Sequence, residues 1–113
     1  MSEKFLTLTL PSDYNQMEGF IKSDKLKLMD HIVSSIGYAV NNNLNVIEVF
    51  NFENSDFIVV LEYNSFESNL DNIYDYYISS EIYEKCGKVL DIKHQINRKN
   101  DQEKRYKSKG LSK

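Results

Sequence analysis

The side chains best suited to catalysis or metal binding are few: two histidines, His31 and His94, and one cysteine, Cys86. The histidines lie on different expected elements, without the spacing that gathers three or four ligands around a zinc ion. Cys86 has no histidine at motif distance, and a thiol nucleophile needs such a base for activation. We predict no catalytic residue, no metal site and no cofactor. We expect Cys86 to be buried, His94 to be partly buried and His31 to face solvent.

A second cluster joins tyrosines and acids between residues 74 and 84. Because tyrosine is enriched at binding hot spots, these residues could form an acidic, aromatic surface for a basic protein partner. The residues expected to face that partner are Asp75, Tyr76, Tyr83 and Glu84. The alternative, which we prefer, is an ordinary helix whose tyrosines pack inward and whose acids face water.

Charge is divided unevenly along the chain. Residues 97–113 hold seven basic and two acidic residues, hence +5, whereas the first 96 residues hold seven basic and fifteen acidic residues, hence −8. The basic segment could bind nucleic acid through phosphate contacts, or it could be a solubilising terminus. An RNA-recognition sheet would need aromatic residues where this chain has Ile58 and Val60. Nucleic-acid binding is therefore the less favoured alternative.

The whole sequence has the composition of one soluble globular domain, with 113 residues, 41% apolar and 27% charged. No run approaches the ~18 apolar residues of a membrane span, and the first residues lack the pattern of a signal peptide. A single cysteine suits a reducing compartment. We therefore predict a cytoplasmic protein without a membrane partner.

A predicted β-hairpin lies at the centre of the chain. Two runs rich in β-branched and aromatic residues, 44–52 and 57–63, flank a polar turn. A helix is expected before it from Ser23 to residues 41–43, because apolar residues recur there every three or four positions. Residues 12–22 are expected to be a connector, in which Met17, Phe20 and Ile21 could form a short helical turn that packs against the core. Since both faces of the run 57–63 are apolar, we expect it to be a central, covered strand.

A second helix is expected after the hairpin, from Asn64 to a break at Ser79 and Ser80. A short helix over 81–86 would follow and end at Gly87. Strictly alternating residues at 5–10 and 89–96 predict a first and a last strand. The order is therefore β-α-β-β-α-β, a ferredoxin-like α+β fold. We expect four antiparallel strands in the order 4-1-3-2, with both helices on one face. Residues 1–96 would form the domain, and 97–113 a flexible tail or a helix that needs a partner.

One face of such a sheet would stay uncovered and largely apolar. Monomers rarely leave a large contiguous apolar patch in water, and an isologous two-fold dimer covers it with the same patch of a second copy. We therefore predict a homodimer through the open sheet face. The residues expected at this interface are Phe5, Thr7, Val46, Phe50, Ile58 and Val60.

Residues 57–89 resemble one half of the dimeric α/β-barrel proteins of the antibiotic-biosynthesis monooxygenase type. The similar features are a strand ending in Glu62 and Tyr63, a polar turn, a helix and the break after Ser79. Members of that group pair sheet to sheet, and some degrade haem or oxidise small aromatic compounds. Haem-degrading members use a first-strand asparagine, a tryptophan and a helix histidine, where this chain has Thr7 or Thr9, no tryptophan, and tyrosines.

Three functions follow from these observations. The favoured one is a small, non-catalytic, homo-oligomeric interaction or regulatory domain, because no convergent set of polar groups marks an active site. The alternatives are a small-molecule enzyme or binder of the dimeric-barrel type, and a nucleic-acid-binding accessory protein that acts through its basic tail.

Overall fold

The computed structural model describes the backbone of residues 7–111 and the side chains of residues 7–101. Phe5 and Leu6, which the sequence places in the first strand, lie outside the described residues. The chain divides into two compact units, Met1–Phe66 and Glu67–Lys113. Each unit is therefore considered by itself.

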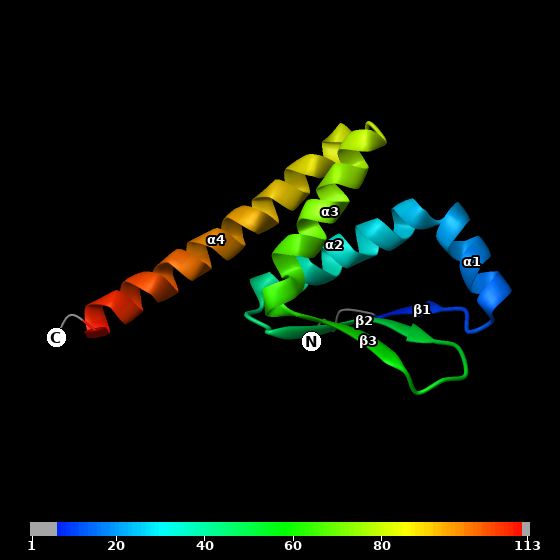
Figure 1. Cartoon of the computed structure of the whole chain (residues 1–113), viewed down its shortest axis with the longest axis horizontal. Coiled ribbons are helices and arrows are strands. Elements are labelled where there is room, and N and C mark those ends of the chain that lie inside the picture. Colours follow the sequence, from blue (N-terminus) through cyan, green and yellow to red (C-terminus); the bar gives the residue numbers. More distant parts are fainter. Residues whose placement is uncertain (1–6, 112–113) are drawn as a thin grey trace, which may run out of the picture. The chain divides into compact units, whose positions relative to one another are not determined.

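The first unit is a small mixed sheet with helices (Figure 1). Its elements are β1 (Leu8–Leu10), α1 (Tyr14–Ser23), α2 (Lys25–Asn41), β2 (Val46–Phe52), β3 (Ile58–Glu62) and the 3-10 turn η1 (Tyr63–Ser65). The strands lie in the order β1-β2-β3, with β1 parallel and β3 antiparallel to β2. Since α1 and α2 connect two parallel neighbours, β1-α-β2 is a crossover unit with a hairpin attached.

The predicted ferredoxin-like fold is therefore wrong, although the chain is α+β. Over the described residues the sheet has three strands, one pair of them parallel, in place of four antiparallel strands in the order 4-1-3-2. The central strand is β2, and β3, which was expected to be central, lies at an edge of the described sheet. The fourth strand is missing because the segment assigned to it, residues 89–96, is helical.

Two helices precede the hairpin, where the sequence predicted one. The residues expected to be a connector form α1, whose N-cap Asp13 accepts a hydrogen bond from the backbone N–H of Gln16 at 3.1 Å. The hydroxyl of Ser23, the expected cap of the next helix, instead donates to the carbonyl of Gly19 at 2.8 Å. The predicted end of α2 is confirmed, because Asn43 has a φ of 58°, the left-handed conformation that asparagine tolerates.

The core of the first unit lies between α2 and β2. Val33, Ile36 and Val40 recur on one side of α2 and are buried, as are Ile47 and Val49 of β2. Burying each such side chain stabilises the fold by roughly 1.5–3 kcal/mol. The helix therefore covers one face of the sheet because its apolar stripe matches the inward residues of β2.

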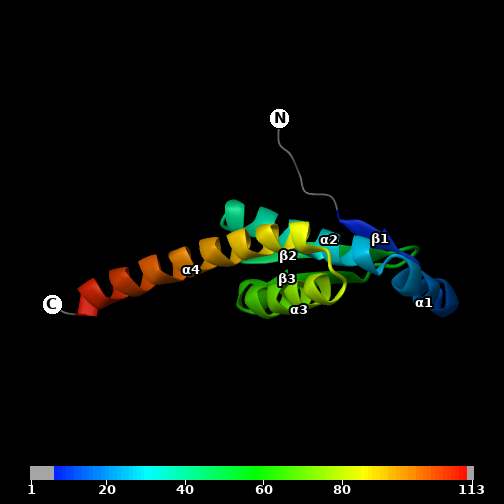
Figure 2. The same ribbon diagram turned by 90° about the horizontal axis from the view of Figure 1, so that it is seen from above.

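The second unit is a helical hairpin of α3 (Phe66–Ser79) and α4 (Tyr83–Leu111), which lie side by side (Figures 1 and 2). Glu81, in the turn between them, has a φ of 59°. The buried side chains recur at helical spacing on both helices and are Leu70, Ile73, Tyr77, Cys86, Val89, Ile92 and Ile96. The Lys93 ammonium donates to the Asp71 carboxylate, so an ion pair also joins the two helices.

The predicted short helix over 81–86 and the predicted last strand over 89–96 are both wrong, because one helix, α4, runs through both. Val89, Ile92 and Ile96 also fit a helical period, and short apolar runs do not distinguish the two periods. Gly87 does not end a helix but lies exposed within α4.

The backbone of α4 crosses residue 96 without a break and continues to Leu111. The predicted division of the chain into a domain and a tail at this residue stays a prediction. None of the described helices combines the length and the apolar composition that crossing a membrane requires.

Candidate functional site

Consecutive apolar side chains lie exposed where β3 begins. Their exposed fractions are 78% for Phe57, 50% for Ile58, 37% for Val59 and 45% for Val60. Because β3 is an edge strand of the described sheet, its outer backbone groups lie beside these side chains. We call residues 57–62 the β3 edge. An exposed apolar strand edge of this kind readily pairs with another strand.

Three of the predicted interface residues meet on the sheet face opposite α2. Val46 pairs with Glu62, and Val60 pairs with Glu48, so these four side chains share one face. Ile58 points to the same face, and Val46 is as exposed as Ile58. Thr7 precedes β1 and is half-buried. The open face is thus a short apolar strip with a glutamate opposite an apolar residue at two positions.

Phe50 does not belong to this strip. The strand register shifts between Glu48, which pairs with Val60, and Phe50, which pairs with Val59. The extra residue in β2 is a β-bulge, which turns the following side chain to the other face. Phe50 therefore lies against His31 of α2, with ring centroids 5.5 Å apart.

The two histidines have the opposite environments from those predicted. His31 is partly buried, and its Nε2 lies 2.8 Å from the carbonyl oxygen of Val49. His94 is exposed on α4. The reason is that α2 turns His31 toward the bulge in β2, whereas residues 89–96 form a helix with an outward side. Cys86 is buried, as predicted, and its thiol lies 3.9 Å from the carbonyl oxygen of Ile82.

The direction of the backbone groups in β3 follows from two hydrogen bonds. The N–H of Tyr63 donates to the carbonyl of Asn45 at 2.8 Å, so the backbone N–H and C=O groups of Tyr63 point toward β2. Successive residues of a strand alternate, and Ile58, Val60 and Glu62 therefore direct their N–H and C=O groups away from β2. The Ser65 hydroxyl donates to the Glu62 carbonyl at 2.8 Å, which agrees with this outward direction.

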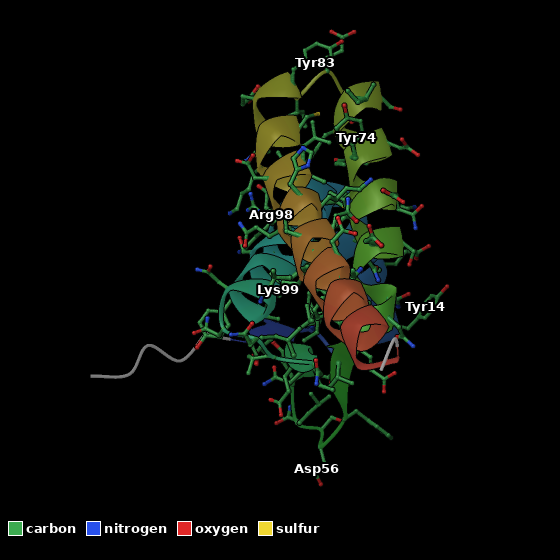
Figure 3. All side chains as sticks on the ribbon, turned by 90° about the vertical axis from the view of Figure 1, so that its left-hand side faces the viewer. Tyr14, Asp56, Tyr74, Tyr83, Arg98 and Lys99 are labelled. Atoms are coloured by element: carbon green, nitrogen blue, oxygen red, sulfur yellow. The ribbon has the colours of Figure 1, made fainter. Side chains whose placement is uncertain are left out.

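An open hollow of about 420 Å³ lies near the β2–β3 turn. Its lining is largely apolar and comprises Pro11, Ser12, Tyr14, Met17, Phe52, Asn54, Ser55 and Phe57. The Ser12 hydroxyl donates to the Glu53 carbonyl, and the Ser55 hydroxyl accepts from the N–H of Phe57 at 3.1 Å. In Figure 3, Asp56 lies at the tip of this turn.

The hollow could hold a small apolar group. The sequence did not predict it because residues 12–22 were expected to be a connector. A helix-start signal, Pro11 to Asp13, was present there.

The predicted partner surface lies in the second unit, near the turn that joins α3 and α4. Asp75, Tyr83 and Glu84 are exposed, and Figure 3 shows Tyr83 at this end of the hairpin. Tyr76 is partly buried, and its ring centroid lies 6.0 Å from that of Tyr77. The exposed part of the surface is therefore more acidic than aromatic.

In the second unit, neighbouring groups shift the pKa of Lys93. Its hydrogen bond to the Asp71 carboxylate raises the pKa of the Lys93 ammonium, burial opposes the rise, and nearby Glu67 adds to it. This pair links α3 to α4 and has a structural role. Over the part of the chain that the structure describes, no three histidine, cysteine or acidic side chains gather as metal ligands.

Phe57 is the residue of the site that sequence reasoning misplaced. The sequence predicted it to lie in a central, covered strand, yet among the described residues it is the most exposed of the large apolar side chains. It precedes the first residue of β3, beyond the end of the strand pairing. The nearby turn residues, Ser55 and Asp56, are the signal that could have placed it outside the core.

Comparison with protein-family models, with curated proteins and with solved structures finds no match for this chain. The resemblance to the dimeric α/β-barrel proteins therefore stays a prediction.

Proposed function

We propose that this chain is a non-catalytic interaction domain that binds a second copy of itself through the β3 edge. The observation that carries the proposal is the run of exposed apolar side chains at residues 57–60 on an edge strand. Proteins that keep an edge strand unpaired usually protect it with charged residues, proline or a bulge in that strand. Residues 57–61 contain neither charge nor proline, and the bulge lies in β2.

Burial of the exposed apolar side chains favours self-association over an isolated chain. Fully burying one valine, isoleucine or phenylalanine side chain contributes roughly 1.5–3 kcal/mol. A two-fold contact buries each residue of the β3 edge twice, once from each copy. Since these side chains are already partly buried, each gains only part of that figure, and their sum over two copies is of the same order as the loss of translational and rotational freedom, roughly 4–15 kcal/mol.

The test is the double variant Ile58→Asp with Val60→Asp, measured by size-exclusion chromatography with light scattering. We expect the wild type to have the mass of a dimer and the variant the mass of a monomer, because the new charges would be buried against each other. The matched control is Ile21→Asp with Ile78→Asp, which changes two similarly exposed isoleucines on α1 and α3. A dimeric mass for both variants would refute the proposal.

The hollow near Tyr14 supports a second candidate, the binding of a small apolar molecule. Its volume of about 420 Å³ falls within the ~300–1,000 Å³ of ligand sites. This candidate is weaker because Tyr14 is 77% exposed and Phe57 is similarly open, whereas a ligand site usually encloses most of its ligand. An apolar fluorescent dye that binds the wild type but not Met17→Asp, at unchanged oligomeric mass, would favour it.

A further inference from the structure

We infer that two copies pair β3 edge to β3 edge, antiparallel, with the two Val60 residues facing each other across the two-fold axis. The two three-stranded sheets would join into one continuous sheet. This inference rests on the proposed self-association and specifies its geometry. It differs from the sheet-face dimer predicted from the sequence, because backbone hydrogen bonds would hold the copies together.

The backbone of β3 has the correct orientation for this pairing. Ile58, Val60 and Glu62 direct their N–H and C=O groups away from β2, as the bond between Tyr63 and Asn45 requires. In an antiparallel ladder, hydrogen-bonded pairs use alternate residues of each strand. With Val60 opposite Val60, Ile58 lies opposite Glu62 of the second copy, so every hydrogen-bonded pair joins two outward-facing residues. The Glu62 carbonyl begins the 3-10 turn and accepts from the Ser65 hydroxyl, so the pair of Ile58 with Glu62 relies on the bond from the Glu62 N–H to the Ile58 carbonyl.

The side chains are self-complementary in the same register. Val60 meets Val60 on the open face, and Ile58 lies beside the aliphatic part of Glu62 from the other copy. On the α2 side of the sheet, Val59 lies opposite Leu61 of the second copy. Such cross-strand neighbours have Cβ atoms about 4.5–5.5 Å apart, within contact distance. No residue of β3 meets a like charge.

The neighbouring registers are worse. With Val59 opposite Val59, Glu62 would face Asp56 of the second copy, and like charges directly opposite each other are destabilising. With Leu61 opposite Leu61, Ile58 would face Asn64, which lies in the 3-10 turn after β3 and not in a strand. The register centred on Val60 is therefore the one that uses the full length of β3, Ile58–Glu62, without opposing charges.

Charge at position 58 tests this register. A lysine placed by Ile58→Lys would face Glu62 of the second copy, whereas a glutamate placed by Ile58→Glu would face a like charge. We expect the dimer Kd of Ile58→Glu to exceed that of Ile58→Lys by about tenfold, or about 1.4 kcal/mol, since the pair occurs twice in the dimer. The double change Ile58→Glu with Glu62→Lys should restore dimerisation.

Val60→Pro tests the backbone bonds. The N–H of Val60 points away from β2, so proline removes no hydrogen bond within the chain, and edge strands tolerate it. We expect a folded monomer by circular dichroism and light scattering. The matched control is Val60→Thr, which keeps the N–H and the β-branched shape and should dimerise measurably.

The outcomes separate this inference from the proposed function. A wild type that is monomeric at tens of micromolar would overturn both. A dimeric wild type that is weakened equally by Ile58→Lys and Ile58→Glu would overturn the edge pairing alone and favour sheet-face packing. If Val60→Pro fails to fold, the two charge variants and their restoring change still decide the register.

Discussion

The imidazole of His31 on α2 packs against the ring of Phe50 on β2, with their ring planes inclined by 42°. The same imidazole reaches the carbonyl of Val49, at the point where the strand register shifts. The His31 side chain therefore supplies a hydrogen-bond partner for the carbonyl of Val49, the extra residue of the bulge. This contact also removes Phe50 from the open face, which leaves the exposed apolar surface concentrated on β3.

Replacing His31 by leucine should destabilise the fold by about 1 kcal/mol, because the Val49 carbonyl would lose a partner in a partly buried place. The matched control is His94→Leu, which changes the exposed histidine and should stay within about 0.5 kcal/mol of the wild type. Urea denaturation midpoints measure both. Equal midpoints for the two variants would contradict the role given to His31.

Gly87→Ala should stabilise the protein by about 0.5–1 kcal/mol. Gly87 lies within α4, none of the described glycines has a positive φ, and a Cβ added at Gly87 would meet no atom within 4 Å. Alanine is the better helix former by about that amount. Thermal melts of the two proteins provide the measurement. A lower melting temperature for the alanine variant would indicate a left-handed helix end at this residue, as the sequence first suggested.

Asp71→Asn should lower the stability at neutral pH by less than about 1 kcal/mol, because water screens the half-exposed pair with Lys93. The folded pKa of Lys93 lies above its ordinary value of 10.5. The pair therefore stabilises the fold fully below the unfolded pKa and loses this contribution as pH rises through the folded pKa. The difference between wild type and variant should shrink as the pH rises above about 10.5. Urea titrations across this pH range measure the difference, with Asp75→Asn as the control. A difference that does not change with pH would contradict the stabilising role given to the Lys93–Asp71 pair.

Local patterns predicted several elements correctly. The stripe of Val33, Ile36 and Val40 marked α2, and the two β-branched runs around a polar turn marked the β2–β3 hairpin. Phe66, Leu70 and Tyr77 marked α3 at its helical spacing. In each case one periodicity dominates over enough residues to exclude the other.

The errors came from features that a local pattern does not determine. Residues 89–96 satisfy both a strand period and a helix period, and in the structure they are helical, with Val89, Ile92 and Ile96 buried at helical spacing. The parallel pairing of β1 with β2 joins residues about forty positions apart, such as Leu8 and Phe50. The bulge moves Phe50 to the other face without any special residue in the sequence. The exposure of the β3 edge, and with it the candidate site, follows from these long-range choices.

The mass of the wild-type protein at sedimentation equilibrium tests self-association most directly. At tens of micromolar, we expect a mass twice the 13.3 kDa of one chain, falling toward the monomer on dilution. A mass of one chain across the whole concentration range would contradict the claim that the β3 edge binds a second copy.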